Sequence, residues 1–283
     1  LAELLKSDFE TSILSRGYGR KTSGFRLVHA SDQAELVGDE PLFYATIFDE
    51  EVHVAVCEKR AEGVQKIQTQ FPSNQLIILD DAYQHRAVKA GFNLLLTEFS
   101  YPFSKDLVLP AGNLREFRAG KKRADAVIVT KCPQTISETE KIHLANSLKV
   151  NKEHLFFSEI VYAPFKAFGQ ERSSIKKVLL VTGIANPSPL IAEIEQKYEV
   201  EHLKFGDHHA FSKQDIEEIH QKFDTFASNE TIILTTEKDF MRLKAVSSSW
   251  KLDDYPWYYQ PITVKIDNEN KFKALINQYV NTI

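Results

Sequence analysis

One stretch decides the fold of this 283-residue chain, and it reads Leu76-Ile77-Ile78-Leu79-Asp80-Asp81-Ala82-Tyr83-Gln84-His85-Arg86. Four consecutive apolar residues predict a buried strand, and two adjacent acids follow at its carboxyl end. A strand that delivers carboxylates to a sheet edge is the Walker-B arrangement, in which Asp80 and Asp81 would hold Mg²⁺ beside phosphate groups. Paired acids after a strand are also common as plain turn residues. The polar groups of Gln84 and His85 favour the binding site.

Short apolar runs recur along the chain, with helical patterns between many of them. The expected strands are 11–15, 52–57, 75–80, 92–97, 125–130, 176–182, 200–205 and 231–236. The expected helices are 59–70, 137–149, 187–198, 212–226, 239–247 and 268–280. Near-continuous apolar strands that alternate with helices predict an α/β protein, with a mostly parallel sheet covered by helices on both faces.

A polar stretch at 169–174 separates two such series and predicts two domains. The larger domain would comprise 1–168, and the segment 267–283 would return to it as a helix. A smaller α/β domain would occupy 169–256. The aromatic segments 155–168 and 257–266 would pair as a two-stranded linker.

Composition limits the possible partners. Hydrophobic residues make up 43% and charged residues 26%, which is typical of a globular chain. The net charge of −4 lacks the basic excess of a duplex nucleic-acid binder, so nucleic acid is not an expected partner. Two cysteines, Cys57 and Cys132, form no CxxC pair and fit a reducing cytosol.

Two basic loops are candidates for an anionic ligand. The first follows the strand at 11–15 and contains Arg16, Gly17, Tyr18, Gly19 and Arg20. It matches neither G-x-G-x-x-G nor a P-loop, because Thr22 replaces the third glycine of the former and Phe25 follows Gly24. A plain glycine turn is the alternative. The second loop, Leu109-Pro110-Ala111-Gly112-Asn113-Leu114-Arg115-Glu116, places an arginine where it could clamp phosphate, although a solvated basic face is the commoner meaning of such a run.

Other polar clusters are weaker signals. Val37-Gly38-Asp39-Glu40-Pro41 places two acids in what reads as a tight turn. Gly206-Asp207-His208-His209 leads into a helix that Ser212 would cap, and it offers an acid, a base or a metal ligand. Thr235-Thr236-Glu237-Lys238-Asp239 reads as a capping arrangement. Thr130-Lys131-Cys132-Pro133 lacks the aspartate of N-K-x-D, so guanine specificity is not supported.

Together the motifs resemble those of the tetraacyldisaccharide 4'-kinases, the lipid A 4'-kinases. They occur in the order SRGYGRKTSG, VGDEP, ILDDAYQHR, LPAGNLRE, RADAVIVTK, TGIANP, DHHAF and TTEKDF. The resemblance implies a P-loop kinase that transfers the γ-phosphoryl of ATP to the 4'-hydroxyl of a tetraacylated glucosamine disaccharide 1-phosphate. It also implies action at the cytoplasmic face of the inner membrane of a Gram-negative bacterium. We further expect a monomer.

The same resemblance implies roles for individual residues. Asp39 would orient or accept the proton of the 4'-hydroxyl, with His208 completing a dyad and His209 as the alternative partner. Asp80 and Asp81 would hold Mg²⁺. The other implied contacts, to nucleotide or substrate, are Gln84, His85, Arg16, Gly17, Tyr18, Gly19, Arg20, Glu40, Arg115 and Glu116.

The chain departs from the family pattern in two places. Ala82 and Tyr83 stand where the family usually has Gly and Phe, which is a mild change. The Walker-A loop and the hydrophobic membrane-associated helix would precede Leu1, so we expect the 283-residue chain itself to be nearly inactive. Two alternatives remain. Another P-loop kinase or a GTPase would use a soluble acceptor, and a non-catalytic relic would have no P-loop sequence upstream in its gene.

Overall fold

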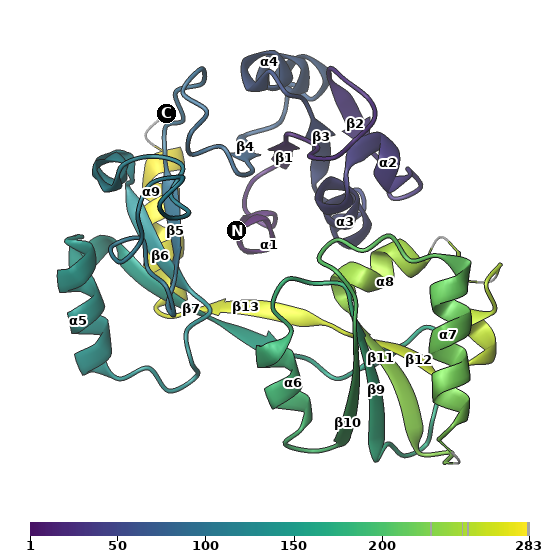
Figure 1. Ribbon diagram of the computed structural model, residues 1–283. Helices are drawn as coiled ribbons and strands as arrows, with labels where there is room; N and C mark the ends of the chain where they lie inside the picture. The colour runs from purple at the N-terminus through teal and green to yellow at the C-terminus, as the bar shows by residue number, and fades with distance from the viewer. Residues whose placement is uncertain (227, 245, 248, 282–283) are drawn as a thin grey trace. The chain divides into compact units, whose positions relative to one another are not determined.

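The structure is a computed structural model that describes residues 1–226, 228–244, 246–247 and 249–281. The chain divides into two units, which can be followed by colour in Figure 1. Unit 1 takes Leu1–Val161 and Val264–Ile283, and unit 2 takes Tyr162–Thr263. None of the helices in the described ranges combines the length and apolarity that crossing a bilayer requires.

The first sheet of unit 1 contains the apolar run Leu76–Leu79 that precedes Asp80 and Asp81. Its strands are β1 (Thr11–Ser15), β2 (Arg26–Val28), β3 (His53–Val56) and β4 (Leu76–Leu79), in the order β2-β3-β1-β4. β1 is buried at every residue and pairs in parallel with β3 and β4, while β2 is antiparallel to β3. The carboxyl ends of three parallel strands therefore meet at one edge of this sheet.

Four helices accompany the first sheet. They are α1 (Ala2–Leu5), α2 (Ala34–Val37), α3 (Asp39–Phe48) and α4 (Arg60–Gln70). α3 contributes Ala45 to a core with Val54 and Val56 of β3, whereas α4 contributes Ile67 to a core with Ala55 of the same strand. Because alternate residues of a strand point to opposite faces, α3 and α4 cover opposite faces of the sheet.

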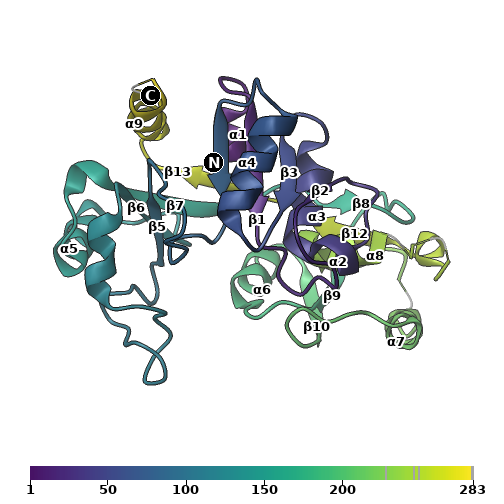
Figure 2. The ribbon, with the colours of Figure 1, turned by 90° about the horizontal axis from the view of Figure 1, so that it is seen from above.

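The second sheet of unit 1 has the order β13-β7-β6-β5. Its strands are β5 (Leu94–Glu98), β6 (Ala126–Thr130), β7 (Leu155–Tyr162) and β13 (Ile262–Ile266), and β5, β6 and β7 are parallel. The helices α5 (Glu138–Leu148) and α9 (Glu269–Val280) pack on alternate residues of β6. They therefore cover opposite faces, as Figure 2 shows. Two 3₁₀ helices, η1 (Arg118–Arg123) and η2 (Lys152–His154), complete the segment.

Unit 2 is built on one five-stranded sheet, ordered β10-β9-β11-β12-β8. The strands are β8 (Lys166–Ala167), β9 (Lys177–Thr182), β10 (Glu199–Lys204), β11 (Thr231–Thr236) and β12 (Trp257–Gln260). All neighbours pair in parallel except β12 and β8. Its helices are α6 (Ser188–Ile194), α7 (Lys213–Asp224), α8 (Glu237–Lys244) and the 3₁₀ helix η3 (Leu252–Asp254). The α/β class predicted from the sequence is confirmed.

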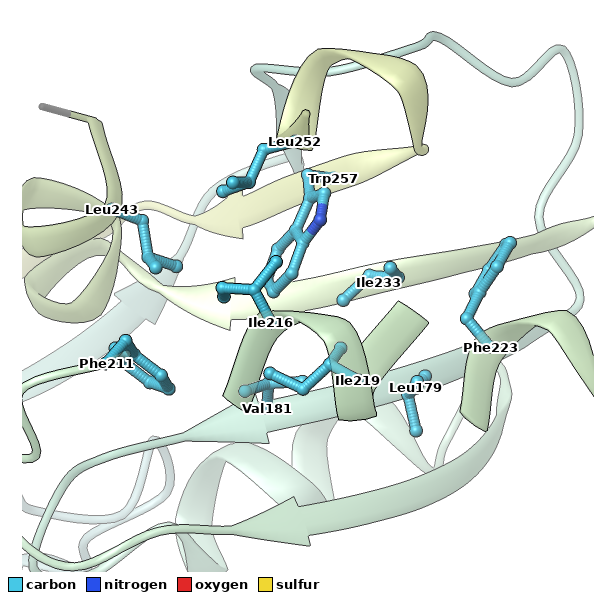
Figure 3. Close-up of a cluster of buried hydrophobic side chains, with 10 residues drawn as sticks. All are labelled: Leu179, Val181, Phe211, Ile216, Ile219, Phe223, Ile233, Leu243, Leu252 and Trp257. Carbon is cyan, nitrogen blue, oxygen red and sulfur yellow. The ribbon is translucent and has the colours of Figure 1, made fainter. Parts of the chain in front are cut away.

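A cluster of buried side chains forms one core of unit 2 (Figure 3). Ile216 and Ile219 of α7 pack there with Ile233 of β11, and all three are fully buried or nearly so. The Trp257 indole is also completely buried in this cluster. The aromatic start of β12 is thus a core element of unit 2.

That burial explains why the unit boundaries differ from those the sequence predicts. The smaller domain is predicted at 169–256 and a linker strand at 257–266, whereas unit 2 covers Tyr162–Thr263. β8 and β12 lie outside the predicted range, yet both belong to the sheet of unit 2. The segments 155–168 and 257–266 were predicted to pair as a two-stranded linker. Their strands β7 and β13 are indeed neighbours, but they are part of the four-stranded sheet that belongs largely to unit 1.

His220 makes the stability of unit 2 sensitive to pH. Trp257 Nε1 donates a hydrogen bond to His220 Nε2 at 3.0 Å, and the imidazole stacks on Tyr255 with ring centroids 3.6 Å apart. Burial lowers the pKa of His220 to about 4. An unfolded histidine titrates near pH 6.5, so between these values the unfolded chain binds more protons than the folded chain. The free energy of unfolding must therefore fall as the pH drops through this window.

We expect this histidine to account for a loss of about 2 kcal/mol between pH 7 and pH 4. The measurement is urea unfolding followed by tryptophan fluorescence at several pH values. His220→Gln keeps an acceptor for the Trp257 indole and should flatten the pH dependence. The matched change at the exposed His143, His143→Gln, should leave it unaltered. Equal pH profiles for wild type and His220→Gln would contradict this account.

Candidate active site

The carboxylate of Asp80 lies at the edge where β1, β3 and β4 end. It follows β4 directly and accepts a hydrogen bond from the Ser15 hydroxyl at the end of β1. Burial raises the pKa of Asp80, and the negative charges of Glu40 and Asp81 raise it further, against the Ser15 hydrogen bond and the charge of Arg60. A carboxylate in this position gains stability when a cation approaches.

Asp81 follows Asp80 directly, but its side chain binds a different partner. Its backbone has a φ of +43°, and its two oxygens form a bidentate pair with Arg115, at 2.5 Å from Nη2 and 3.1 Å from Nη1. The adjacent Glu116 pairs with Arg123 at 2.6 Å and with Arg86 at 3.2 Å. Asp81 and Arg115, which the sequence predicts as metal ligand and phosphate contact, are therefore bonded to each other here. The contacts tie the segment after β4 to the segment before β6.

The loop after β1 packs against the turn that leads into α3. Gly38 has a φ of +96°, and a Cβ there would lie 3.1 Å from the Tyr18 carbonyl oxygen and 3.3 Å from the Gly17 Cα. Only glycine fits such a close approach with that backbone conformation. The sequence predicts a tight turn for 37–41. Instead, Gly38 separates α2 from α3, and Asp39 and Glu40 occupy the first turn of α3.

Arg20 holds this loop together from inside. Its side chain is only 2% exposed and donates to the Gly24 carbonyl at 2.6 Å and to Glu58 at 2.5 Å. Burial of Glu58 would raise its pKa, but hydrogen bonds from its own backbone, Arg20 and Gly24 hold the pKa below its usual range. The guanidinium predicted to contact substrate is thus bonded within the loop. Arg16 and Tyr18, by contrast, are exposed.

Two residues near Asp80 are absent from the predictions made on sequence. Arg60 is almost fully buried at the start of α4, and it donates to the Cys57 carbonyl at 2.6 Å and to the Asp80 carbonyl at 3.4 Å. Tyr44 lies one turn into α3, where burial and the charges of Asp80, Glu40 and Asp81 raise its pKa. Neither Arg60 nor Tyr44 belongs to a recognisable sequence motif. Their closeness to Asp80 is therefore evident only from the fold.

A second polar cluster lies at the sheet edge of unit 2, where β9, β10 and β11 end. Asp239 is completely buried and accepts hydrogen bonds from the Gly183 amide at 2.9 Å and the Thr236 hydroxyl at 2.7 Å. It also pairs with Arg242 at 3.0 Å. Arg242 Nη2 lies 3.1 Å from His208 Nδ1, and because a guanidinium only donates, Nδ1 is the acceptor. The buried carboxylate thus fixes the arginine, which in turn orients His208.

The two adjacent histidines have different surroundings. His208 has a φ of +56°, which is uncommon for a residue with a side chain, and its Nε2 lies 3.4 Å from Lys238 Nζ. His209 Nε2 instead lies 3.0 Å from Asp215, the acid that forms the capping box of α7 with Ser212. Its ring also contacts Phe205 and Phe211. His209 is therefore occupied with the start of α7, whereas His208 lies at the polar edge.

The donor set at Asp80 fits one of the predicted cofactors. In nucleotide sites Mg²⁺ takes one or two carboxylates and completes its shell with water and phosphate oxygens. The Asp80 carboxylate, the Ser15 hydroxyl and the nearby Glu40 are hard oxygen donors of this kind. Among the described residues no group of three or more His, Cys, Asp or Glu could hold a metal ion.

His85 fits a contact with a ligand. Its Nε2 atom is buried and finds no hydrogen-bond partner within the part of the chain that the structure describes. A buried polar nitrogen without a partner is costly, and a bound group that supplies one would remove that cost. The nucleotide contact predicted for His85 stays a prediction.

Comparisons with known proteins bear on the whole chain. Residues 1–281 match the family described as "Tetraacyldisaccharide-1-P 4'-kinase". A "Tetraacyldisaccharide 4'-kinase" of Flavobacterium johnsoniae is 39% identical over 99% of this chain and 81% of that protein. One of Bacteroides fragilis is 37% identical over 99% of this chain and 78% of that protein.

A solved structure has the same fold. The crystal structure of LpxK from Aquifex aeolicus, described as a complex with ATP, matches with a TM-score of 0.69 and 24% sequence identity. The match covers 99% of this chain and 81% of that chain. Because the family match and the relatives above 30% identity extend over nearly the whole chain, the family predicted from the sequence motifs is confirmed. This chain belongs to the tetraacyldisaccharide-1-P 4'-kinase family.

Proposed function

We propose that the full-length gene product performs the reaction of its family, the ATP-dependent phosphorylation of the 4'-hydroxyl of tetraacyldisaccharide 1-phosphate in lipid A biosynthesis. The observation that carries the proposal is the agreement between a family match over residues 1–281 and a half-buried Asp80 at the end of β4, with the acids Glu40 and Asp81 near it. Phosphoryl transfer depends on positioning and on neutralising charge, and both the carboxylates and the arginines of unit 1 serve these ends.

We assign the divalent ion to Asp80, with the Ser15 hydroxyl beside it. Mg²⁺ bound there would supply positive charge to the β- and γ-phosphates of ATP. Asp81 keeps Arg115 in place through the bidentate pair, which positions a guanidinium close to the metal-binding carboxylate. His85 would contact the nucleotide through its buried Nε2 atom. The loop with Arg16 and Tyr18 would contact the substrate.

The acceptor hydroxyl needs a group that orients it and takes its proton. We assign this role to Asp39, which lies half-buried in the first turn of α3 beside Gly38. A loose phosphoryl-transfer transition state needs little basicity from such a group, so a carboxylate suffices. We also assign a role in the reaction to His208, which Arg242 orients within unit 2. The proposed place of action is the cytoplasmic face of the inner membrane.

Asp39→Asn tests this assignment in the full-length gene product, with labelled ATP and tetraacyldisaccharide 1-phosphate. We expect kcat to fall by about a hundredfold or more with little change in KM, because the lost interaction acts in the transition state. The matched control is Asp49→Asn, the same change at the exposed residue that follows the opposite end of α3. Full activity in Asp39→Asn would remove Asp39 from the mechanism.

A further inference from the structure

The segment between β5 and η1 exposes large apolar side chains. Leu107 is 55% exposed, Leu109 59% and Phe117 78%, and Tyr101 is also exposed. Figure 2 shows the connection between β5 and β6 projecting away from the sheet. Single exposed apolar residues are ordinary, but four within residues 101–117 are a concentration that calls for a binding partner. We refer to residues 101–117 as the 101–117 loop.

The 101–117 loop is fixed from inside. Asp106 is buried and accepts hydrogen bonds from the Leu107 amide at 2.7 Å and the Asn113 amide at 3.1 Å. Arg118 donates to the Asp106 carbonyl at 2.9 and 2.6 Å. A Cβ on Gly112 would lie 2.3 Å from the Leu107 carbonyl oxygen, so the chain closes tightly there. The apolar side chains are therefore held outward by a built turn.

The charge of this region is opposite to that of the protein. Residues 101–123 contain six lysines and arginines and two acids, whereas the whole chain has a net charge of −4. Both acids are already engaged, since Asp106 accepts backbone amides and Glu116 pairs with Arg86 and Arg123. Lys105 and Lys122 are exposed. The segment 101–123 thus combines exposed apolar side chains with exposed positive charge, the combination that binds anionic lipid interfaces.

The 101–117 loop is also tied to the candidate site. Its Arg115 forms the bidentate pair with Asp81, and just beyond it the Gly120 carbonyl accepts a hydrogen bond from Tyr83 at 2.9 Å. The guanidinium of Arg123 lies 4.7 Å from the centre of the Tyr83 ring. A surface held at the 101–117 loop is therefore held close to the residues that follow β4.

We propose that the 101–117 loop docks onto an anionic lipid bilayer, with Leu107, Leu109 and Phe117 entering the interface and Lys105 and Lys122 facing the headgroups. The inference rests on the proposed function, because an acylated disaccharide resides in a bilayer and its hydroxyl must reach the site from there. Apolar area and attraction to anionic lipid add up in such binding.

The test measures sedimentation of the 283-residue chain with vesicles of phosphatidylglycerol and phosphatidylethanolamine, and with phosphatidylcholine vesicles for comparison. The triple variant Leu107→Ser/Leu109→Ser/Phe117→Ser should bind the anionic vesicles at least about tenfold more weakly than the parent chain. The double variant Lys105→Glu/Lys122→Glu should also lose about tenfold, and added salt should weaken binding of the parent.

A control variant removes the same kind of side chain elsewhere in unit 1. Ile47→Ser/Ile142→Ser/Val264→Ser changes three exposed apolar residues outside the 101–117 loop and should bind like the parent. Parent-like binding by the Leu107 triple variant, or no binding of the parent to anionic vesicles, overturns the proposal. Equal thermal unfolding of all variants shows that folding is unaffected.

Kinase activity is measured separately from vesicle binding. The proposed function and the proposed docking surface can therefore be overturned one without the other. The Leu107 triple variant in the full-length gene product should phosphorylate detergent-dispersed acceptor at the parental rate. Asp80→Asn should bind vesicles like the parent. Vesicle binding through the loop without any lipid phosphorylation would overturn the proposed function and leave the docking surface standing. Lipid phosphorylation without vesicle binding through the 101–117 loop would overturn the docking surface and leave the proposed function standing.

Discussion

Replacing Asp80 with asparagine should lower kcat by about a hundredfold to a thousandfold while leaving the protein at least as stable as the wild type. The loss follows from removing the carboxylate assigned to the divalent ion. The stability follows from the raised pKa of Asp80, which means that its charged form is unfavourable in the folded state. The substitution should therefore lower activity without lowering stability. This is expected where a residue serves function at the expense of stability.

The measurements are steady-state kinetics over a range of Mg²⁺ concentrations and thermal unfolding of the same preparations. Asp49→Asn again serves as the control and should match the wild type in both. Asp80→Asn with near-normal kcat would remove Asp80 from the mechanism. A large drop in Tm would instead show that the carboxylate is a structural group.

The second large effect separates the adjacent histidines. His208→Ala should reduce kcat by about a hundredfold, because an assisting imidazole contributes in the transition state. His209→Ala should keep kcat and lower the free energy of unfolding by about 1 kcal/mol, since it removes the hydrogen bond to Asp215 at the start of α7. The two variants delete the same side chain at neighbouring positions, so each is the control for the other.

Kinetics and urea unfolding of both variants decide the question. Loss of activity in His209→Ala with normal kcat in His208→Ala would reverse the assignment. Arg242→Lys adds a finer test, because it keeps the charge but loses the planar geometry that reaches both Asp239 and His208 Nδ1. A partial loss of kcat in this variant would identify Arg242 as a positioning residue.

Local sequence patterns predicted the strands well because burial leaves a direct mark on composition. β1 is buried at every residue and was expected at its observed bounds, and the apolar run of β4, which is half-buried, was also expected as a strand. The family itself followed from the order of the motifs, which the comparisons confirm. The α3 helix was missed, because Gly38 and Pro41 read as a turn when the tertiary packing of Gly38 against Gly17 is unknown.

The partners of the site residues could not be read from sequence. Asp80 and Asp81 are neighbours with the same side chain, but Asp81 pairs with Arg115, which lies 34 positions further along the chain. Arg20 looks like a ligand contact in a basic loop, and only its contact with Glu58 shows that it is buried. The aromatic residues of β12 were predicted to form a linker strand. The complete burial of Trp257 shows instead that β12 contributes to a core. Long-range contacts decided each of these cases.

The most direct test of the central claim is phosphate transfer by the full-length gene product. The assay supplies ATP labelled at the γ-phosphate and tetraacyldisaccharide 1-phosphate, and it locates the label in the product. We expect a bisphosphorylated lipid with the label on the 4'-oxygen, and we expect Asp80→Asn to lose this product. Absence of labelled lipid with active wild-type protein, or transfer to a soluble acceptor in its place, would contradict this expectation.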